Sequence, residues 1–195
     1  MNQRMLTSCE WQRRAARPFE IRLHAYTIYG SFGFCPDCGI HNSLQIAKAN
    51  FDLVLRMLDL SKNADEEIRT KMIENCLEDA VSAFDGFGRE HCRTTIANIS
   101  FQNIVRARDR LANDHGVDIS SGLSASEWSF VATQFQKRHL LAHTMGVVDQ
   151  DFIDKTGIPS SMIGKKVQIS QGDVSSLVIH LGQISKTLCA GIQRS

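Results

Sequence analysis

The chain has 195 residues, of which 43% are hydrophobic and 22% are charged, a composition that is ordinary for a soluble globular protein. This apolar content supplies a core and excludes wholesale disorder, and the length suggests one domain with an appendage. The 22 Lys and Arg residues nearly balance the 21 Asp and Glu residues, so no global basic field attracts nucleic acid and any such contact is local. No apolar run approaches the about 18 residues of a membrane span, and no signal-peptide core is present. We therefore expect a cytoplasmic protein with no membrane partner.

Residues 1–41 form the predicted appendage. Its first 20 residues are irregular and positively charged, which is typical of a frayed terminus. Residues 20–34 alternate roughly between apolar and polar side chains, and Gly30 and Gly33 interrupt them. This pattern predicts a short hairpin or a strand and a turn.

A Cys35-x2-Cys38 pair follows these strands and resembles a zinc knuckle. Zinc prefers four sulfur or imidazole ligands, but only one such pair is present, and neither His24 nor His41 completes a standard spacing. Two interpretations stay open: zinc bound at Cys35 and Cys38 with non-standard or shared ligands, or a degenerate remnant whose cysteines only cap the turn. The remaining cysteines are expected to be reduced thiols; they are Cys9, Cys76, Cys92 and Cys189.

From residue 42 onward the hydrophobic period becomes helical, which predicts an all-α bundle over 42–195. Ser43 is the expected N-cap of the first helix, and Ser124 with Glu127 forms a candidate capping box for the fourth. The apolar stripes predict helices near 43–61, 64–88, 101–113, 125–145 and 149–155, and a last helix that begins at 170–173. Lys166–Ile169 is expected to be a short extended piece.

The predicted helix 125–145 carries an unusual polar cluster. At about 100° per residue, His139 and His143 lie about 40° apart, one turn above each other. Arg138 lies about 140° from His143, but its long side chain can reach around the helix, while Leu140 and Leu141 anchor the opposite side. Two imidazoles and a guanidinium suit phosphodiester cleavage by internal 2′-OH attack, because histidine transfers protons near neutrality and arginine holds phosphate oxygens. This chemistry demands no metal.

Spacing alone leaves two other interpretations of this cluster. A His pair at i and i+4 is half of a metal site, although no HExxH glutamate accompanies it. A polar stripe on a bundle helix is also often a solvated or interface face.

Arg138-x4-His143, with His139 directly after the arginine, resembles the Rx4–6H signature of HEPN-domain ribonucleases. The stretch 135–143, followed by 146–149 and by Phe152-Ile153, is similar to the motif helix and turn of bacterial HEPN proteins. Residues 79–84 resemble the second-helix segment of that group, and the resemblance spans roughly 42–192.

This resemblance implies an all-α bundle that dimerises through its motif helices, so that two copies form one composite cleft. Many HEPN domains are metal-independent endoribonucleases that leave cyclic phosphate ends, and they are often toxin-like or linked to phage defence. By carry-over, His143 is the acid/base group, Arg138 the phosphate clamp and His139 an assisting or orienting group. RNA, a homodimeric partner and a neutralising antitoxin or activating partner are then expected, and catalysis requires no cofactor. The alternative is a non-catalytic helical dimerisation module or a nucleotide- or RNA-binding module.

Substrate binding would need local positive charge. Lys137 in the motif helix, and Arg106, Arg108 and Arg110 in the predicted third helix, are the candidates. The three arginines equally fit a solvated helix face. Aromatic residues near the motif lie at helical spacing and are expected in the core rather than stacked on RNA bases.

Overall fold

The computed structural model of the chain describes residues 41–192. Within this range the chain is all-α, as predicted, and it contains no strand of a sheet. The expected strands and the Cys35/Cys38 pair of the appendage lie outside the described residues. The α-helices are α2 (Ser43–Ser61), α3 (Glu66–Cys92), α4 (Ile104–His115), α5 (Ala125–Thr144), α6 (Gln150–Thr156) and α7 (Gln171–Gly191), and a 3₁₀ helix, η1, spans Ser160–Met162.

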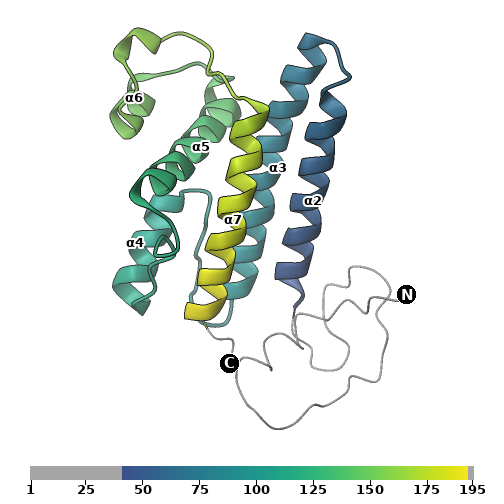
Figure 1. Cartoon of the computed structure of the whole chain (residues 1–195). Helices are drawn as coiled ribbons and strands as arrows, with labels where there is room; N and C mark the ends of the chain where they lie inside the picture. Colours follow the sequence, from purple (N-terminus) through teal and green to yellow (C-terminus); the bar gives the residue numbers. More distant parts are fainter. Residues whose placement is uncertain (1–40, 193–195) are drawn as a thin grey trace, which may run out of the picture.

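Four long helices, α2, α3, α5 and α7, lie side by side (Figure 1). The central helix is α3, which contacts α2, α5 and α7. The two short helices attach to opposite ends of α5: α4 lies beside its first half and α6 beside its last turns (Figure 1). The C-terminal end of α5 is therefore bordered by α6 on one side and by the bundle on the other.

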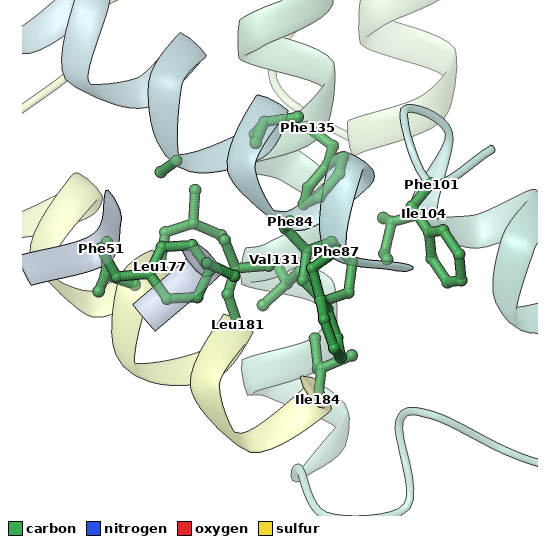
Figure 2. Close-up of a cluster of buried hydrophobic side chains, with 14 of the residues drawn as sticks. Phe51, Phe84, Phe87, Phe101, Ile104, Val131, Phe135, Leu177, Leu181 and Ile184 are labelled. Atoms are coloured by element: carbon green, nitrogen blue, oxygen red, sulfur yellow. The ribbon is translucent and has the colours of Figure 1, made fainter. Parts of the chain in front are cut away.

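The predicted apolar stripes of α2, α3 and α7 fill the core. Phe84 of α3 lies at its centre, in edge-on contact with Phe101 at 5.6 Å and Phe135 at 6.4 Å between ring centroids (Figure 2). Burying such side chains is the main favourable term in folding. The stripe residues that are at least nine-tenths buried are Ala47, Phe51, Val54, Leu58, Ile73, Leu77, Ala80, Phe84, Phe87, Val174, Leu177, Leu181, Ile184 and Leu188.

A second, smaller hydrophobic cluster lies under α6. Leu140 of α5 packs there with Phe152 and Ile153 of α6, and with Val148 and Val167 from the flanking loops. This cluster holds α6 and the loops around it against the end of α5.

Several expected boundaries shift by one to four residues: α3 continues to Cys92 rather than ending at 88, and α4 begins at Ile104 rather than at 101. The N-cap of α2 is Asn42 rather than Ser43, since both side chains are good caps and sequence does not decide between neighbours. Lys166–Ile169 forms no strand but a single antiparallel bridge from Val147 to Lys166. Close packing explains why residue 88 of α3 is a glycine, since a Cβ atom there would overlap the Phe101 ring.

Candidate active site

Helix α5, which carries the motif, is fixed at its start by the predicted capping box. The backbone N–H of Glu127 donates to Ser124 Oγ at 3.3 Å, and the Glu127 carboxylate accepts from the Ser124 N–H at 2.7 Å. Two orphan amides of the first turn are thereby satisfied. Val131 and Phe135 then anchor the first half of the helix in the main core.

The buried side of α5 changes along its length. Val131 and Phe135 are buried on the face toward the bundle, whereas Ala142, about 20° from Val131 on a helical wheel, is exposed. In the last turns burial moves to the opposite side, where Leu140 packs under α6. The motif therefore lies where the core-facing side of α5 emerges from the bundle.

His139 and His143 lie together in the last turns of α5. Both side chains are exposed, and their ring centroids are 4.4 Å apart at an interplanar angle of 48°. The predicted pairing of the two imidazoles is therefore present. Proton acceptance by one ring and donation by the other can occur on the same bound group at this separation.

The charge environment favours the neutral form of His139. Partial burial of the ring lowers its pKa below the ordinary value, and the neighbouring charges of His143 and Lys155 lower it further. Asp151 and Asp149 act in the opposite direction without reversing the shift. Near pH 7 the ring is thus in the form that accepts a proton.

Arg138, the residue before His139 in α5, is half-buried. Its Nε is buried and has no hydrogen-bond partner within residues 41–192, and the same holds for Oε1 of Gln134, one turn earlier. A guanidinium has five donors and no acceptor. A buried N–H without a partner is an unsatisfied donor.

The other basic candidates lie elsewhere. The Lys137 ammonium binds Asp173 of α7 at 3.1 Å and is only 13% exposed, so it joins two helices. Arg108 pairs with Asp118 and lies 5.3 Å from the ring of Trp128. Trp128 is in the first turn of α5, about 22 Å along the helix axis from His143.

Arg106 and Arg110 also lie on α4, away from His139 and His143. Arg110 donates to the carbonyl oxygens of Asn98 and Ala97 at 3.3 and 2.9 Å, and Arg106 is exposed. Within one copy of the chain, the structure brings the rings of His139 and His143 together; Arg138 shares their helix, whereas Arg106 and Arg110 lie on α4.

The segment after α5 is held by an ion pair that the sequence did not indicate. Lys166 Nζ lies 2.7 Å from Oε1 of Glu74, a residue of α3 that is buried. Nearby, the backbone N–H of Val148 donates to the carbonyl oxygen of Lys165, and that of Val167 donates to the carbonyl oxygen of Gly146. Glu74 and Lys166 are 92 positions apart in the chain, so only the three-dimensional packing reveals this support of the motif turn.

Within residues 41–192, no three His, Cys, Asp or Glu side chains are arranged to hold a metal ion. The His139/His143 pair therefore has no third ligand among these side chains. None of the described helices is both long and apolar enough to cross a membrane.

Comparison with known proteins finds no matching family model, no matching curated protein and no matching solved structure.

Proposed function

We propose that the chain is a metal-independent endoribonuclease that cleaves RNA by internal attack of a ribose 2′-OH. One observation carries the proposal: two exposed imidazoles in contact, with a half-buried guanidinium adjacent in sequence, occur in the last turns of α5. General acid/base groups and a fixed cation are the groups that this reaction needs.

In this mechanism His143 acts as the acid/base group, and Arg138 binds the phosphate and the charge that develops on it. His139, kept neutral by its surroundings, assists by accepting or relaying the 2′-OH proton. The leaving 5′-oxygen takes a proton, and the product carries a 2′,3′-cyclic phosphate.

Two copies of the chain would form the working site. Exposed apolar side chains follow the motif directly: Met145 is 85% exposed and Val147 is 41% exposed. Apolar surface of this kind favours a protein interface, and a two-fold contact there places two motifs in one cleft. Arg138 of one protomer and His143 of its partner then act on the same phosphodiester.

A ribonuclease of this kind harms the cell that makes it unless it is controlled. The proposal therefore includes a toxin- or defence-like role, with a neutralising antitoxin or an activating partner. Single-stranded RNA is the proposed substrate, since its phosphodiesters can adopt the in-line geometry that internal attack needs.

The test is an RNA cleavage assay in EDTA with end-group analysis. His143→Ala and Arg138→Ala should each reduce the cleavage rate by about 100- to 1,000-fold while leaving the circular dichroism spectrum unchanged. RNA with 2′-O-methyl groups should resist the wild-type protein, because the attacking nucleophile is blocked.

Matched controls are present in the chain. His115 also lies in the last turn of a helix, α4, and Arg56 is an exposed arginine on α2; alanine at either position should leave cleavage unchanged. Full activity of His143→Ala would refute the assignment. A wild-type dimer that leaves RNA intact would favour a non-catalytic dimerisation or nucleotide-binding module.

A further inference from the structure

Helix α2 carries a second apolar stripe outside the one that faces the core. Ile46, Leu53 and Leu60 recur every seven residues, so they lie within about 40° of one another and about 120° from the buried stripe that contains Phe51 and Leu58. Leu53 is 49% exposed, Leu60 is 64% exposed and Ile46 is half-buried. One apolar face is enough to hold a helix on a bundle, so packing within a single chain does not account for the outer stripe.

Two hollows in the surface flank this outer stripe. One, of about 290 Å³, lies between α2 and α3, with Leu53 and Met57 on one side and Ala83 on the other. The second, of about 330 Å³, lies beside Arg56 and Leu60. Partner side chains that fill such hollows supply much of the binding energy of a protein interface.

The outer stripe is remote from the motif. Helix α2 lies at one edge of the bundle, on the opposite side from α6 (Figure 1), and it packs against α3 and α7. A contact on the outer stripe therefore leaves Met145, Val147 and the motif accessible to the two-copy site proposed above.

The charges beside the stripe favour a second copy of α2 as its occupant. Asp52 and Arg56 are exposed and lie on the same side of Leu53. Among residues 41–192 neither of them takes part in an ion pair. In an antiparallel pair of α2 helices centred on Leu53, Arg56 of one copy and Asp52 of the other are about 3 Å apart along the helix axis. A parallel pair would instead place like charges side by side.

We propose that the outer stripe of α2 is a self-association surface, on which a second copy packs its own α2 in the antiparallel direction about Leu53. Ile46 of each copy then lies opposite Leu60 of the other, because these residues are seven positions to either side of Leu53. Apolar side chains at this spacing interlock between helices in coiled coils. Arg56 and Asp52 form two symmetric ion pairs at the edge of the contact.

The test is oxidative cross-linking of single cysteine substitutions in the full chain. Leu53→Cys should form a covalent dimer, because the two-fold axis passes beside residue 53 of both copies. Leu60→Cys is the matched control: its two copies lie about 21 Å apart along the paired helices, too far for a disulfide, and should cross-link no more than the wild type. A mixture of Ile46→Cys and Leu60→Cys chains should cross-link between the two variants.

Charge reversal tests the orientation of the pair. In the Leu53→Cys chain, Arg56→Asp should lower the yield of covalent dimer by about tenfold, because two carboxylates then lie side by side. Adding Asp52→Arg to this variant should restore the yield, since the opposite charges meet again. Lys48→Asp makes the same change of charge on α2 away from the stripe, and it should have no effect.

Three outcomes would overturn the proposal. Leu53→Cys could cross-link no better than Leu60→Cys, or Leu60→Cys could cross-link efficiently with itself, which indicates a parallel pair. The third is slow alkylation of Leu53→Cys by maleimide in a chain that sediments as a monomer, which indicates that another segment of the same chain covers the stripe. None of these measurements depends on ribonuclease activity, so the two proposals stand or fall separately.

Discussion

His139 lies among charges that make its protonation state sensitive to its surroundings. Partial burial and the charges of His143 and Lys155 lower its pKa, and these groups come from both α5 and α6. The same arrangement that favours the neutral ring also links the stability of the fold to pH.

We predict that His139→Asn removes part of the acid sensitivity of folding. The pKa of His139 is lower in the folded chain than the about 6.5 of an unfolded chain. Between these two values the unfolded chain binds more protons, so stability falls as pH decreases. This destabilisation is absent at pH values above the pKa of His139 in the unfolded chain, and it is complete at pH values below its pKa in the folded chain. Urea titrations at a series of pH values between about 8 and 5 measure it.

The same substitution at His115, at the end of α4 and away from this cluster, is the control. His139→Asn should show a flatter dependence of unfolding free energy on pH than both the wild type and His115→Asn. An unchanged slope in His139→Asn would contradict the assigned shift.

At the residue scale, the sequence predicted the pairing of His139 with His143 but not the ion pairs of the nearby lysines. Helical periodicity was enough to place His139 and His143 together, because both lie on one continuous helix. Periodicity did not indicate that Lys137 would bind Asp173 or that Glu74 would bind Lys166. Both ion pairs join segments distant in sequence.

The end of α5 combines an unfavourable backbone conformation with an unusual side chain. Met145 is the C-cap and has φ 53°, in the left-handed region. This conformation costs a non-glycine residue about 1–2 kcal/mol, and glycine is the usual solution. The methionine contributes little to the core in return, since its side chain is 85% exposed.

Met145→Gly should therefore stabilise the isolated protomer by about 0.5–1 kcal/mol, after allowing for the greater freedom of glycine in the unfolded chain. Urea unfolding under monomeric conditions measures this change. Ala142→Gly, three residues earlier and inside the helix, should instead destabilise by about 1 kcal/mol. If Met145→Gly lost as much stability as Ala142→Gly, strain at this cap would be disproved.

At the element scale, the sequence predicted the helices and their buried stripes because apolar period and capping residues agree. Ser124 with Glu127, and Ser170 with Asp173, form capping boxes. The sequence did not predict that α5 would change its buried side near Leu140. That change comes from α6 folding back over the helix, which is a tertiary contact and leaves no periodic signal.

The proposed two-copy site makes a prediction about the whole molecule. Arg138→Ala and His143→Ala should each lose most of the cleavage activity alone. Mixed dimers of the two variants should regain part of the cleavage activity, because one composite position in each mixed dimer keeps both groups. Co-expression with different affinity tags and tandem purification isolates these dimers for the EDTA assay.

Mixed dimers as inactive as their parents would place both groups in one chain rather than across two. A homodimer could be expected from the sequence only through the family resemblance, since no pattern in one chain indicates where a second copy packs. The same limit applies to the contact between His91 and Cys189, because these residues become neighbours only when α3 and α7 pack together.

The small hydrophobic cluster beneath α6 has a consequence for the local dynamics of the chain. Because only five well-buried side chains form it, this corner can detach and reclose at a lower free energy than the four long helices. Each opening would carry Asp149, Asp151 and Lys155 away from His139 for a moment. Proton affinity at the motif would then vary with a local breathing motion, while the rest of the molecule stays folded.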